Sequence, residues 1–283
     1  MRIGISGGSG NLARETAEHL IDMAGAESIV LITRTPDGLG EFSDRGVEVR
    51  PGDFDRPETL ADAFAGLDRL LLISTDRIGS RMSQHENAIA AASSSDIGFV
   101  AYTSYTRPEE GNPAAVAAEH LLTEPILRGA DFDLCILRNS TYADYERGGL
   151  QRARETGKLL TNTGDGRVAY VSRDDCAAAA AVVLTGEGHA GQLYDVTGPE
   201  LLDADGRAAV MSALIGSPVE VVQLDDEAFA ERSAAATGMP IEMARMFATS
   251  GRAVREGYLD LISDDFEKLT GRSPKTLEAV LSE

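Results

Sequence analysis

Two kinds of hydrophobic pattern alternate along the first half of the chain. Short continuous apolar runs, of which Ser28–Thr33 is the clearest, are typical of strands buried on both faces of a sheet. Between them lie segments such as Leu12–Ala24, in which apolar residues recur at helical spacing. The expected strands are Arg2–Ser6, Ser28–Thr33, Gly46–Arg50, Leu70–Ser74, Phe99–Thr103 and Asp133–Leu137. The expected helices are Leu12–Ala24, one that starts with Thr59–Phe64, His85–Ala92 and Ala114–Arg128.

This alternation, with its short connections, predicts an α/β fold with a doubly wound parallel sheet of Rossmann type. After Arg138 the pattern is less regular, and a smaller C-terminal α+β lobe is expected. Its expected helices are Tyr142–Thr156, Arg173–Leu184, Ala204–Leu214, Asp226–Ala236 and a final Asp264–Leu269, with strands at Gln192–Val196 and Val219–Gln223 and turns over Gly157–Val171. We expect residues 1–138 to form the core domain, with 173–198 returning to it, and 139–172 and 199–283 to form the lobe.

A glycine-rich turn joins the first expected strand to the first helix. The segment from Gly7 to Ala13 has the form GxxGxxA, in which Gly7 makes the tight turn and Gly10 lets the backbone approach a diphosphate. The first helical residues, Asn11 and Leu12, would then offer free N–H groups and the positive end of the helix dipole. Because the motif follows a strand and opens a helix, it predicts a dinucleotide site in the core domain rather than a structural glycine turn.

The choice of dinucleotide depends on the end of the second strand. NAD-binding units place an acidic residue roughly 20 residues beyond the last glycine, but here that position holds Arg34. A guanidinium group can pair with the 2′-phosphate of NADP(H), so we predict NADP(H) as the cofactor. Two alternatives stay open, namely that Arg34 is an ordinary surface charge and that Asp37 folds back onto the ribose.

Further cofactor contacts are expected at the ends of the third and fourth strands, where ligands of parallel sheets collect. Asp53 can accept a hydrogen bond from the adenine amino group, with Phe54 against the ring. Asp53 or Asp55 could instead cap the next helix, which we expect of Asp55. Ser74 and Thr75 are expected under the ribose or the nicotinamide.

Composition narrows the function. The 283 residues include 26 basic and 46 acidic side chains, a net charge of −20, which disfavours nucleic acid and anionic membrane surfaces as partners. Two cysteines without a CxxC motif or a Cys/His cluster predict neither a metal site nor a disulfide framework, and with no signal peptide we expect a cytoplasmic protein. The expected partner is therefore a small molecule, and a homodimer is left open.

Several segments together resemble the NmrA-like atypical short-chain dehydrogenase/reductases. They are GISGGSGNLA, RPGDFDRPETL, LLLIST, VAYTSY, AEHLLTEPILRGADFDLCILRNSTY and TGDGRVAYVSRDDCAAAAA. The likeness is strongest to the branch that contains NADPH:quinone oxidoreductase type 2 and triphenylmethane reductase, and weakest between Asp203 and Tyr258. It implies a Rossmann core, NADP(H) and a substrate-binding lobe. It also implies a set of cofactor neighbours, namely Gly7, Gly10, Arg34, Asp53, Phe54, Ser74, Thr75 and Asn139.

The chain lacks the Tyr-x-x-x-Lys pair of classical short-chain enzymes, since none of its three lysines follows a tyrosine at that spacing. A quinone or conjugated carbonyl needs no such pair, because water can protonate the product once hydride has been transferred. Position of the acceptor against the nicotinamide matters more. We therefore predict hydride transfer to a planar conjugated acceptor. The alternatives are an NAD(P) sensor without turnover and a biosynthetic ketone or enone reductase.

Three side chains are candidates for a catalytic role. His120 could orient a carbonyl or relay a proton near neutral pH, or could be a structural helix histidine. Tyr105 and Tyr142 could donate to, or stack on, a planar acceptor, with wall packing an equal alternative. We interpret His19, His85 and His189 as structural.

An apolar stripe is expected on a helix after Pro240. Its members recur at helical spacing, and they are Met239, Met243, Met246 and Phe247. Such a stripe is either part of the core or a lid that adapts to flat aromatic ligands.

Overall fold

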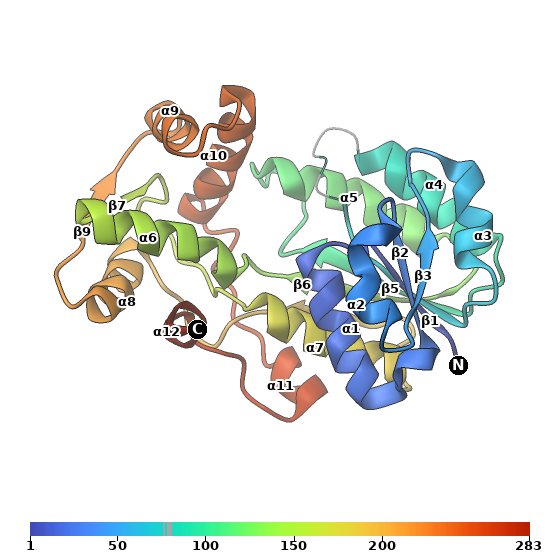
Figure 1. Ribbon diagram of the computed structural model, residues 1–283. Helices are drawn as coiled ribbons and strands as arrows, with labels where there is room; N and C mark the ends of the chain where they lie inside the picture. Colours follow the sequence, from blue (N-terminus) through green and yellow to red (C-terminus); the bar gives the residue numbers. More distant parts are fainter. Residues whose placement is uncertain (76, 78–80) are drawn as a thin grey trace.

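The computed structural model describes residues 1–75, 77 and 81–283, and Figure 1 shows a sheet domain beside a smaller lobe. Within these residues, seven parallel strands form the main sheet in the order β3-β2-β1-β4-β5-β6-β8. The strands are β1 (Ile3–Ser6), β2 (Ile29–Thr33), β3 (Glu48–Pro51), β4 (Arg69–Leu72), β5 (Phe99–Tyr105), β6 (Asp133–Asn139) and β8 (Leu193–Val196). The order reverses between β1 and β4, which is where doubly wound sheets bind ligands. The predicted α/β fold class is confirmed.

Helices cover both faces of the sheet (Figure 1). On one face pack α1 (Asn11–Ala24), α2 (Gly40–Ser43), α7 (Arg173–Thr185) and α11 (Asp265–Thr270). On the other pack α3 (Leu60–Phe64), α4 (Arg81–Ser93) and α5 (Ala115–Arg128). Single 3₁₀ turns lie at Ala26–Ser28, Pro36–Leu39, Pro57–Thr59 and Ala143–Tyr145. No helix of the described chain is both long and apolar enough to cross a membrane.

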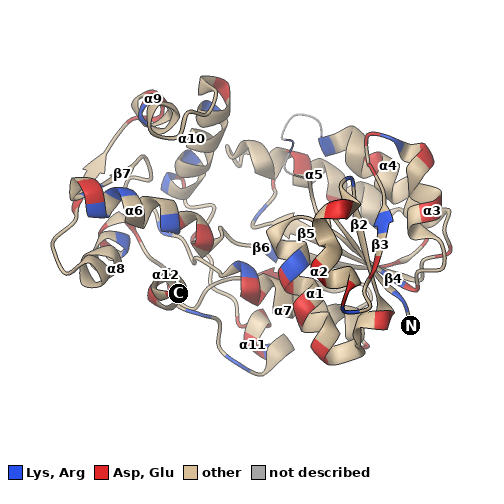
Figure 2. Cartoon of the chain, viewed as in Figure 1, with Lys and Arg blue, Asp and Glu red and all other residues tan. Residues whose placement is uncertain are grey.

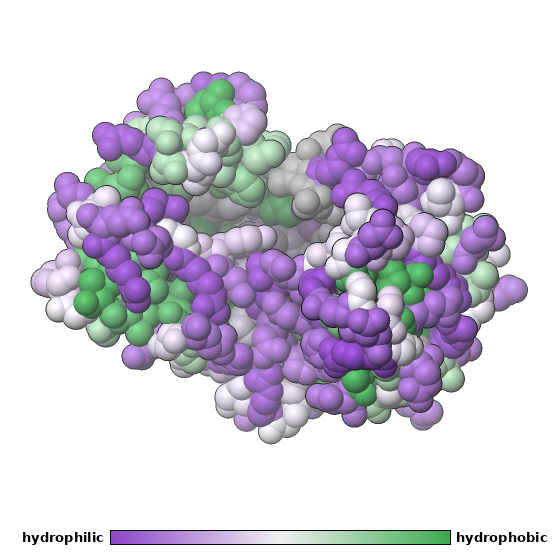
Figure 3. Space-filling view, in the orientation of Figure 1, coloured by the Kyte–Doolittle hydropathy of each residue, from purple (hydrophilic) through white to green (hydrophobic). Residues whose placement is uncertain are grey.

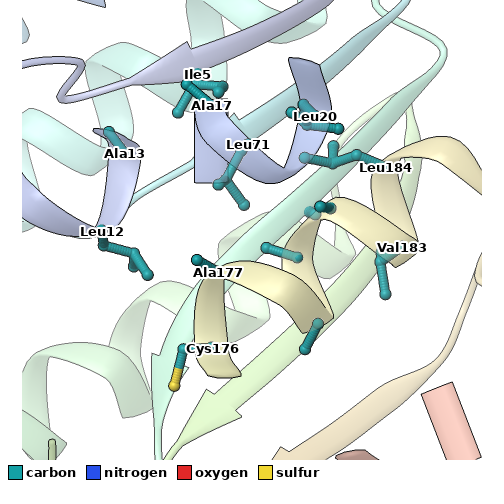
Figure 4. Packing of buried hydrophobic residues seen from close by; sticks show 14 of the residues in the cluster. Ile5, Leu12, Ala13, Ala17, Leu20, Leu71, Cys176, Ala177, Val183 and Leu184 are labelled. Carbon is teal, nitrogen blue, oxygen red and sulfur yellow. The ribbon is translucent and has the colours of Figure 1, made fainter. Parts of the chain in front are cut away.

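Small side chains bring α1 and α7 close together (Figure 4). Ala13 and Ala17 of α1 are buried, as is the run Ala177–Ala181 of α7. Alanine keeps the two helix backbones near one another and near the sheet, and larger residues such as Leu20 and Leu184 fill the remaining space. This packing fixes the orientation of α1 relative to the sheet, and therefore the position of the N-terminus of α1 at the end of β1.

The lobe contains a second, two-stranded parallel sheet and a set of helices. Its elements are α6 (Glu146–Thr156), β7 (Lys158–Thr161), α8 (Ala204–Ile215), β9 (Glu220–Gln223), α9 (Asp226–Thr237), α10 (Ile241–Arg255) and α12 (Leu277–Ser282). Buried residues of α6, α8, α10 and α12 share one apolar cluster. A hydrogen bond of 3.0 Å from the N–H of Ala115 to Oγ1 of Thr249 ties α10 to the start of α5.

Two elements of the lobe differ from the prediction. Residues 157–171 were expected to form turns, but they include β7, which pairs with β9 from a distant part of the chain. Asp264–Leu269 was expected to be the final helix, but α12 follows it, with Leu277, Val280 and Leu281 buried at helical spacing. Both elements are short, so distant contacts rather than local pattern stabilise them.

Candidate functional site

The turn after β1 has the geometry that an anion site requires. Gly7 has a φ of +65°, a conformation that favours glycine, and the N–H of Gly8 donates to the carbonyl of Ile32 at 2.8 Å. Gly10 is the N-cap of α1, and no side chain caps the helix. The first N–H groups of α1, at Asn11 and Leu12, are therefore left for an external acceptor.

A cavity opens beside this turn, at the carboxyl ends of the strands. Seven of the ten predicted cofactor neighbours line it, namely Gly7, Gly10, Arg34, Asp53, Phe54, Ser74 and Thr75. Its lining also includes residues that the sequence analysis missed, namely Ser9, Ile32, Thr33, Gly52, Ile73, Arg77 and Gln84. Asn11, Leu12 and Asn139 adjoin the site through their elements but are not part of this lining.

Two guanidinium groups reach the cavity, and only one of them is already paired. Arg77 forms an ion pair with Asp55 at 2.7 Å, and the same carboxylate accepts from Nε2 of Gln84 at 2.9 Å. Arg34 is exposed at the end of β2, and within the described residues no carboxylate pairs with it. The positive charge of Arg34 is thus available to a ligand, although acidic side chains are spread over α1 to α4 (Figure 2).

The segment after β3 is held by its own turn. The N–H of Asp55 donates to Oδ1 of Asp53 at 3.0 Å, and Asn87 donates to the carbonyl of Phe54 at 2.8 Å. The prediction that Asp55 caps the next helix is wrong, since no side chain caps the 3₁₀ turn or α3 and the Asp55 carboxylate binds Arg77 and Gln84 instead. These contacts fix Asp53 and Phe54 at the wall of the cavity.

A second group of polar side chains lies at the ends of β5 and β6. Asn139 is buried and donates through Nδ2 to the hydroxyl of Tyr142 at 3.3 Å, while its Oδ1 has no partner in the described chain. Tyr105 is the register partner of Asn139 on β5. Burial raises the pKa of Tyr105 to about 12 and raises that of Tyr142 as well, so both phenols are un-ionised at neutral pH.

His120 lies inside the domain rather than at the cavity. It is 2% exposed, and its Nδ1 is 2.7 Å from the hydroxyl of Tyr102. Burial holds the pKa of His120 well below its usual range, so the ring is a neutral imidazole. A catalytic role for His120 stays a prediction, and it would have to operate through this neutral ring.

The Met-rich stripe, of which Met243, Met246 and Phe247 lie on α10, is only partly buried. Met243 is 43% exposed and Phe247 is 49% exposed, while Met239 and Met246 are partly buried. Since α10 contacts the start of α5, this helix lies at the same edge of the sheet as the cavity. Figure 3 shows a hollow in the surface between this part of the lobe and the sheet domain.

Arg173 connects Tyr142 to a cluster of charged groups around α1. Its guanidinium lies 5.4 Å from the ring centroid of Tyr142, 3.2 Å from Asp144 and 3.9 Å from Glu15. Burial, reinforced by Asp144 and Asp174, raises the pKa of Glu15 to about 7. One oxygen of this carboxylate is buried without a partner, so its ionised form is poorly accommodated.

We expect Glu15→Gln to stabilise the protein at alkaline pH. A carboxyl with a raised pKa favours folding below its unfolded pKa near 4.5, and this contribution is lost as pH rises through about 7. Because the side chain is partly exposed, the gain at pH 8 should be about 1–2 kcal/mol, shrinking toward pH 4.5. Urea unfolding at both pH values measures it. Glu18→Gln on the same helix is the control, since Glu18 pairs with Arg45 and should show no gain. An equal effect of Glu15→Gln at both pH values would contradict the assignment.

Within the described residues, no three histidine, cysteine or acidic side chains are grouped so that they could hold a metal ion.

Comparison with known proteins identifies the family. Residues 7–187 match the family described as NAD(P)H-binding. Over 99% of this chain and 97% of the relative, the sequence is 32% identical to quinone oxidoreductase 2 of Escherichia coli. The crystal structure of that enzyme complexed with NADPH superimposes with a TM-score of 0.94, covering 99% of this chain and 98% of the other. The triphenylmethane reductase of Citrobacter, complexed with NADP(H), is 33% identical with a TM-score of 0.93, covering 100% and 99%.

The chain belongs to this NAD(P)H-binding, NmrA-like family of oxidoreductases, as the resemblance of its segments predicted. A more distant relative is the NAD(P)H azoreductase of Xenophilus azovorans, 25% identical over 96% of this chain and 94% of its own length.

Proposed function

We propose that the protein is an NADPH-dependent reductase that transfers hydride to a quinone or a similarly planar, conjugated acceptor. The observation that carries the proposal is the similarity to quinone oxidoreductase 2, because it extends over the lobe as well as the sheet domain. The names of the other two relatives point to acceptors of the same kind, a triphenylmethane dye and an azo compound. All three acceptors are conjugated compounds that can accept a hydride or its two electrons.

In this proposal the cofactor occupies the cavity beside the turn after β1. The uncapped N-terminus of α1 binds the diphosphate through the N–H groups of Asn11 and Leu12. Arg34 binds the 2′-phosphate, and Asp53 and Phe54 contact the adenine. Ser74, Thr75 and Asn139 contact the ribose and nicotinamide end, where the free Oδ1 of Asn139 suits the N–H donor of a carboxamide.

Residues 1–138 with 173–198 would form the cofactor domain, and 139–172 with 199–283 the lobe that holds the acceptor, except that α11 packs on the main sheet. Bound NADPH supplies a hydride, which brings two electrons and one proton to the acceptor. A quinone reduced in this way needs one further proton, which water can provide. Tyr105 and Tyr142 are un-ionised and can donate a hydrogen bond to the acceptor oxygen, where negative charge develops.

The test is turnover by the purified protein. We expect steady oxidation of NADPH in the presence of 1,4-benzoquinone, with hydroquinone formed in equal amount. Binding of NADPH without oxidation by a quinone, a triphenylmethane dye or an azo dye would contradict the proposal and would favour an NAD(P) sensor.

The exposed side of α10 gives a separate prediction about the acceptor. If Phe247 forms part of the acceptor wall, Phe247→Ala removes an aromatic surface on which a planar ring can pack. We expect KM for the quinone to rise about 3- to 10-fold, which corresponds to about 0.5–1.5 kcal/mol of aromatic contact. The dissociation constant for NADPH should not change.

Met23→Ala is a matched control for Phe247→Ala. Met23 is 51% exposed on α1, so it tests the loss of an exposed apolar side chain elsewhere on the surface. If both variants change KM equally, or neither does, Phe247 does not contact the acceptor.

A further inference from the structure

The chain that leaves β4 at the cavity is held by side chains rather than by a neighbouring strand. Three successive backbone N–H groups donate to side-chain acceptors on three different elements. The pairs are Ile73 with Oγ of Ser6 at 2.9 Å, Ser74 with Oγ1 of Thr103 at 2.9 Å, and Thr75 with Nε2 of His85 at 3.4 Å. All three donors belong to residues that line the cavity, so these acceptors determine the shape of its wall.

The peptide groups of Thr75 are held from two sides by one helix. His85 accepts a hydrogen bond from the backbone N–H of Thr75, and Nε of Arg81 donates one to the backbone carbonyl oxygen of Thr75. Arg81 and His85 are four residues apart on α4, so they lie one above the other on the same face of the helix. Both side chains are buried. Two buried side chains of α4 thus fix the orientation of a single residue at the cavity.

His85 is itself held in the tautomer that this role requires. Its Nδ1 lies 2.9 Å from Oγ1 of Thr123, and that hydroxyl donates to the carbonyl of Glu119 at 2.8 Å. Since a hydroxyl has one proton, Thr123 must accept from Nδ1–H, and the lone pair of Nε2 is left for Thr75. Burial and the charge of Arg81 lower the pKa of His85 to about 4, so the ring stays neutral.

The side chain of Thr75 points to a ligand as the reason for this arrangement. Its Oγ1 is buried and has no hydrogen-bond partner within the described chain, although Thr75 lines the cavity. We infer that His85 and Arg81 are positioning residues that hold Thr75 so that its hydroxyl meets the bound dinucleotide. The inference rests on the proposed cofactor site. It gives His85 a part in cofactor binding, where the sequence alone had indicated only a structural role.

The test compares two substitutions of His85 in the full chain. His85→Phe keeps a ring of similar size but removes the acceptor, leaving the N–H of Thr75 unpaired. We expect the dissociation constant for NADPH to rise about tenfold, with KM for the quinone unchanged. His85→Gln, whose side-chain amide oxygen can take the place of Nε2, should stay within about twofold of the wild type. A role confined to general packing would not produce rescue by glutamine.

His189→Phe is the control, because His189 also bonds a hydroxyl, that of Tyr194 at 3.0 Å, but does not line the cavity. If His85→Phe fails to fold, the nearly isosteric Thr123→Val serves instead. This substitution removes the hydroxyl that accepts from Nδ1–H, so the proton of His85 is no longer confined to Nδ1. We expect the dissociation constant for NADPH to rise about threefold. If the wild-type protein binds NADPH and the folded variant, His85→Phe or Thr123→Val, binds it with the same affinity, the inference is overturned. Failure of the wild type to bind NADPH overturns the proposed function as well.

Discussion

Replacing Arg34 by alanine is expected to raise the dissociation constant for NADPH about 10- to 100-fold while leaving that for NADH nearly unchanged. Arg34 lies at the end of β2 and at the cavity, and its charge is not consumed by a carboxylate of the described chain. A charge-assisted hydrogen bond to a phosphate contributes about 1.5–3 kcal/mol, and NADH has no phosphate at that position. Fluorescence titration with both dinucleotides measures the two constants directly.

Arg45→Ala is the control for this substitution, because Arg45 is exposed, pairs with Glu18 and does not line the cavity. It alters the net charge by the same amount, so it accounts for long-range electrostatics. An unchanged ratio of NADPH to NADH affinity in Arg34→Ala would contradict the role of Arg34. Arg77→Ala would then be the next substitution to examine, since Arg77 also lines the cavity.

Much of the sheet domain could be predicted because its signals are local. A strand such as Ile29–Thr33, buried on both faces, is a continuous apolar run, and the helix Asn11–Ala24 has a buried stripe at helical spacing. The lobe gives weaker signals. Lys158–Thr161 becomes a strand only by pairing with Glu220–Gln223, and such a distant partner leaves no trace in the local pattern.

The same distinction applies to the site. The carboxyl ends of parallel strands meet at one edge, so residues such as Arg34, Asp53 and Ser74 could be expected together from their place after strands. The positions of Gln84 and Arg77 could not be expected in this way. They lie 22 or more residues after Asp55 in the sequence, and their contacts with its carboxylate hold them at the cavity. Asp55 was assigned to a local cap for the same reason, since only the folded chain shows its distant partners.

The acidic composition bears on how a dinucleotide can be bound at all. A net charge of −20 opposes a polyanionic ligand, and a basic surface patch would be the usual remedy. The turn after β1 can bind the anion in a different way, because its backbone N–H groups attract a diphosphate without any positively charged side chain. If this is how the diphosphate is bound, access to those N–H groups should matter as much as any charged residue.

Gly10→Val is therefore expected to weaken the binding of NADPH and of NADH equally, on the order of 100-fold. A side chain at this position blocks the close approach of the diphosphate to the backbone, which costs about 1–3 kcal/mol or more of binding free energy. Gly10 has φ −77° and ψ 155°, which any residue can adopt, and an added Cβ would have one close contact, at 3.1 Å from the carbonyl oxygen of Gly7, which would have to shift by a few tenths of an ångström. The fold should tolerate the substitution at a cost of about 1 kcal/mol for a poorer N-cap. Gly7 offers no such test, because its φ of +65° makes every substitution there a change of backbone as well.

Titration of the Gly10→Val variant with both dinucleotides, together with its unfolding midpoint, separates lost binding from lost stability. Gly40→Ala is the matched control, since Gly40 is in right-handed helical conformation and an added Cβ would meet nothing within 4 Å. Equal losses for NADPH and NADH distinguish this substitution from Arg34→Ala, which should affect NADPH alone. If Gly10→Val bound both dinucleotides as the wild type does, the diphosphate could not lie against the first turn of α1, and the acidic protein would need another way to hold it.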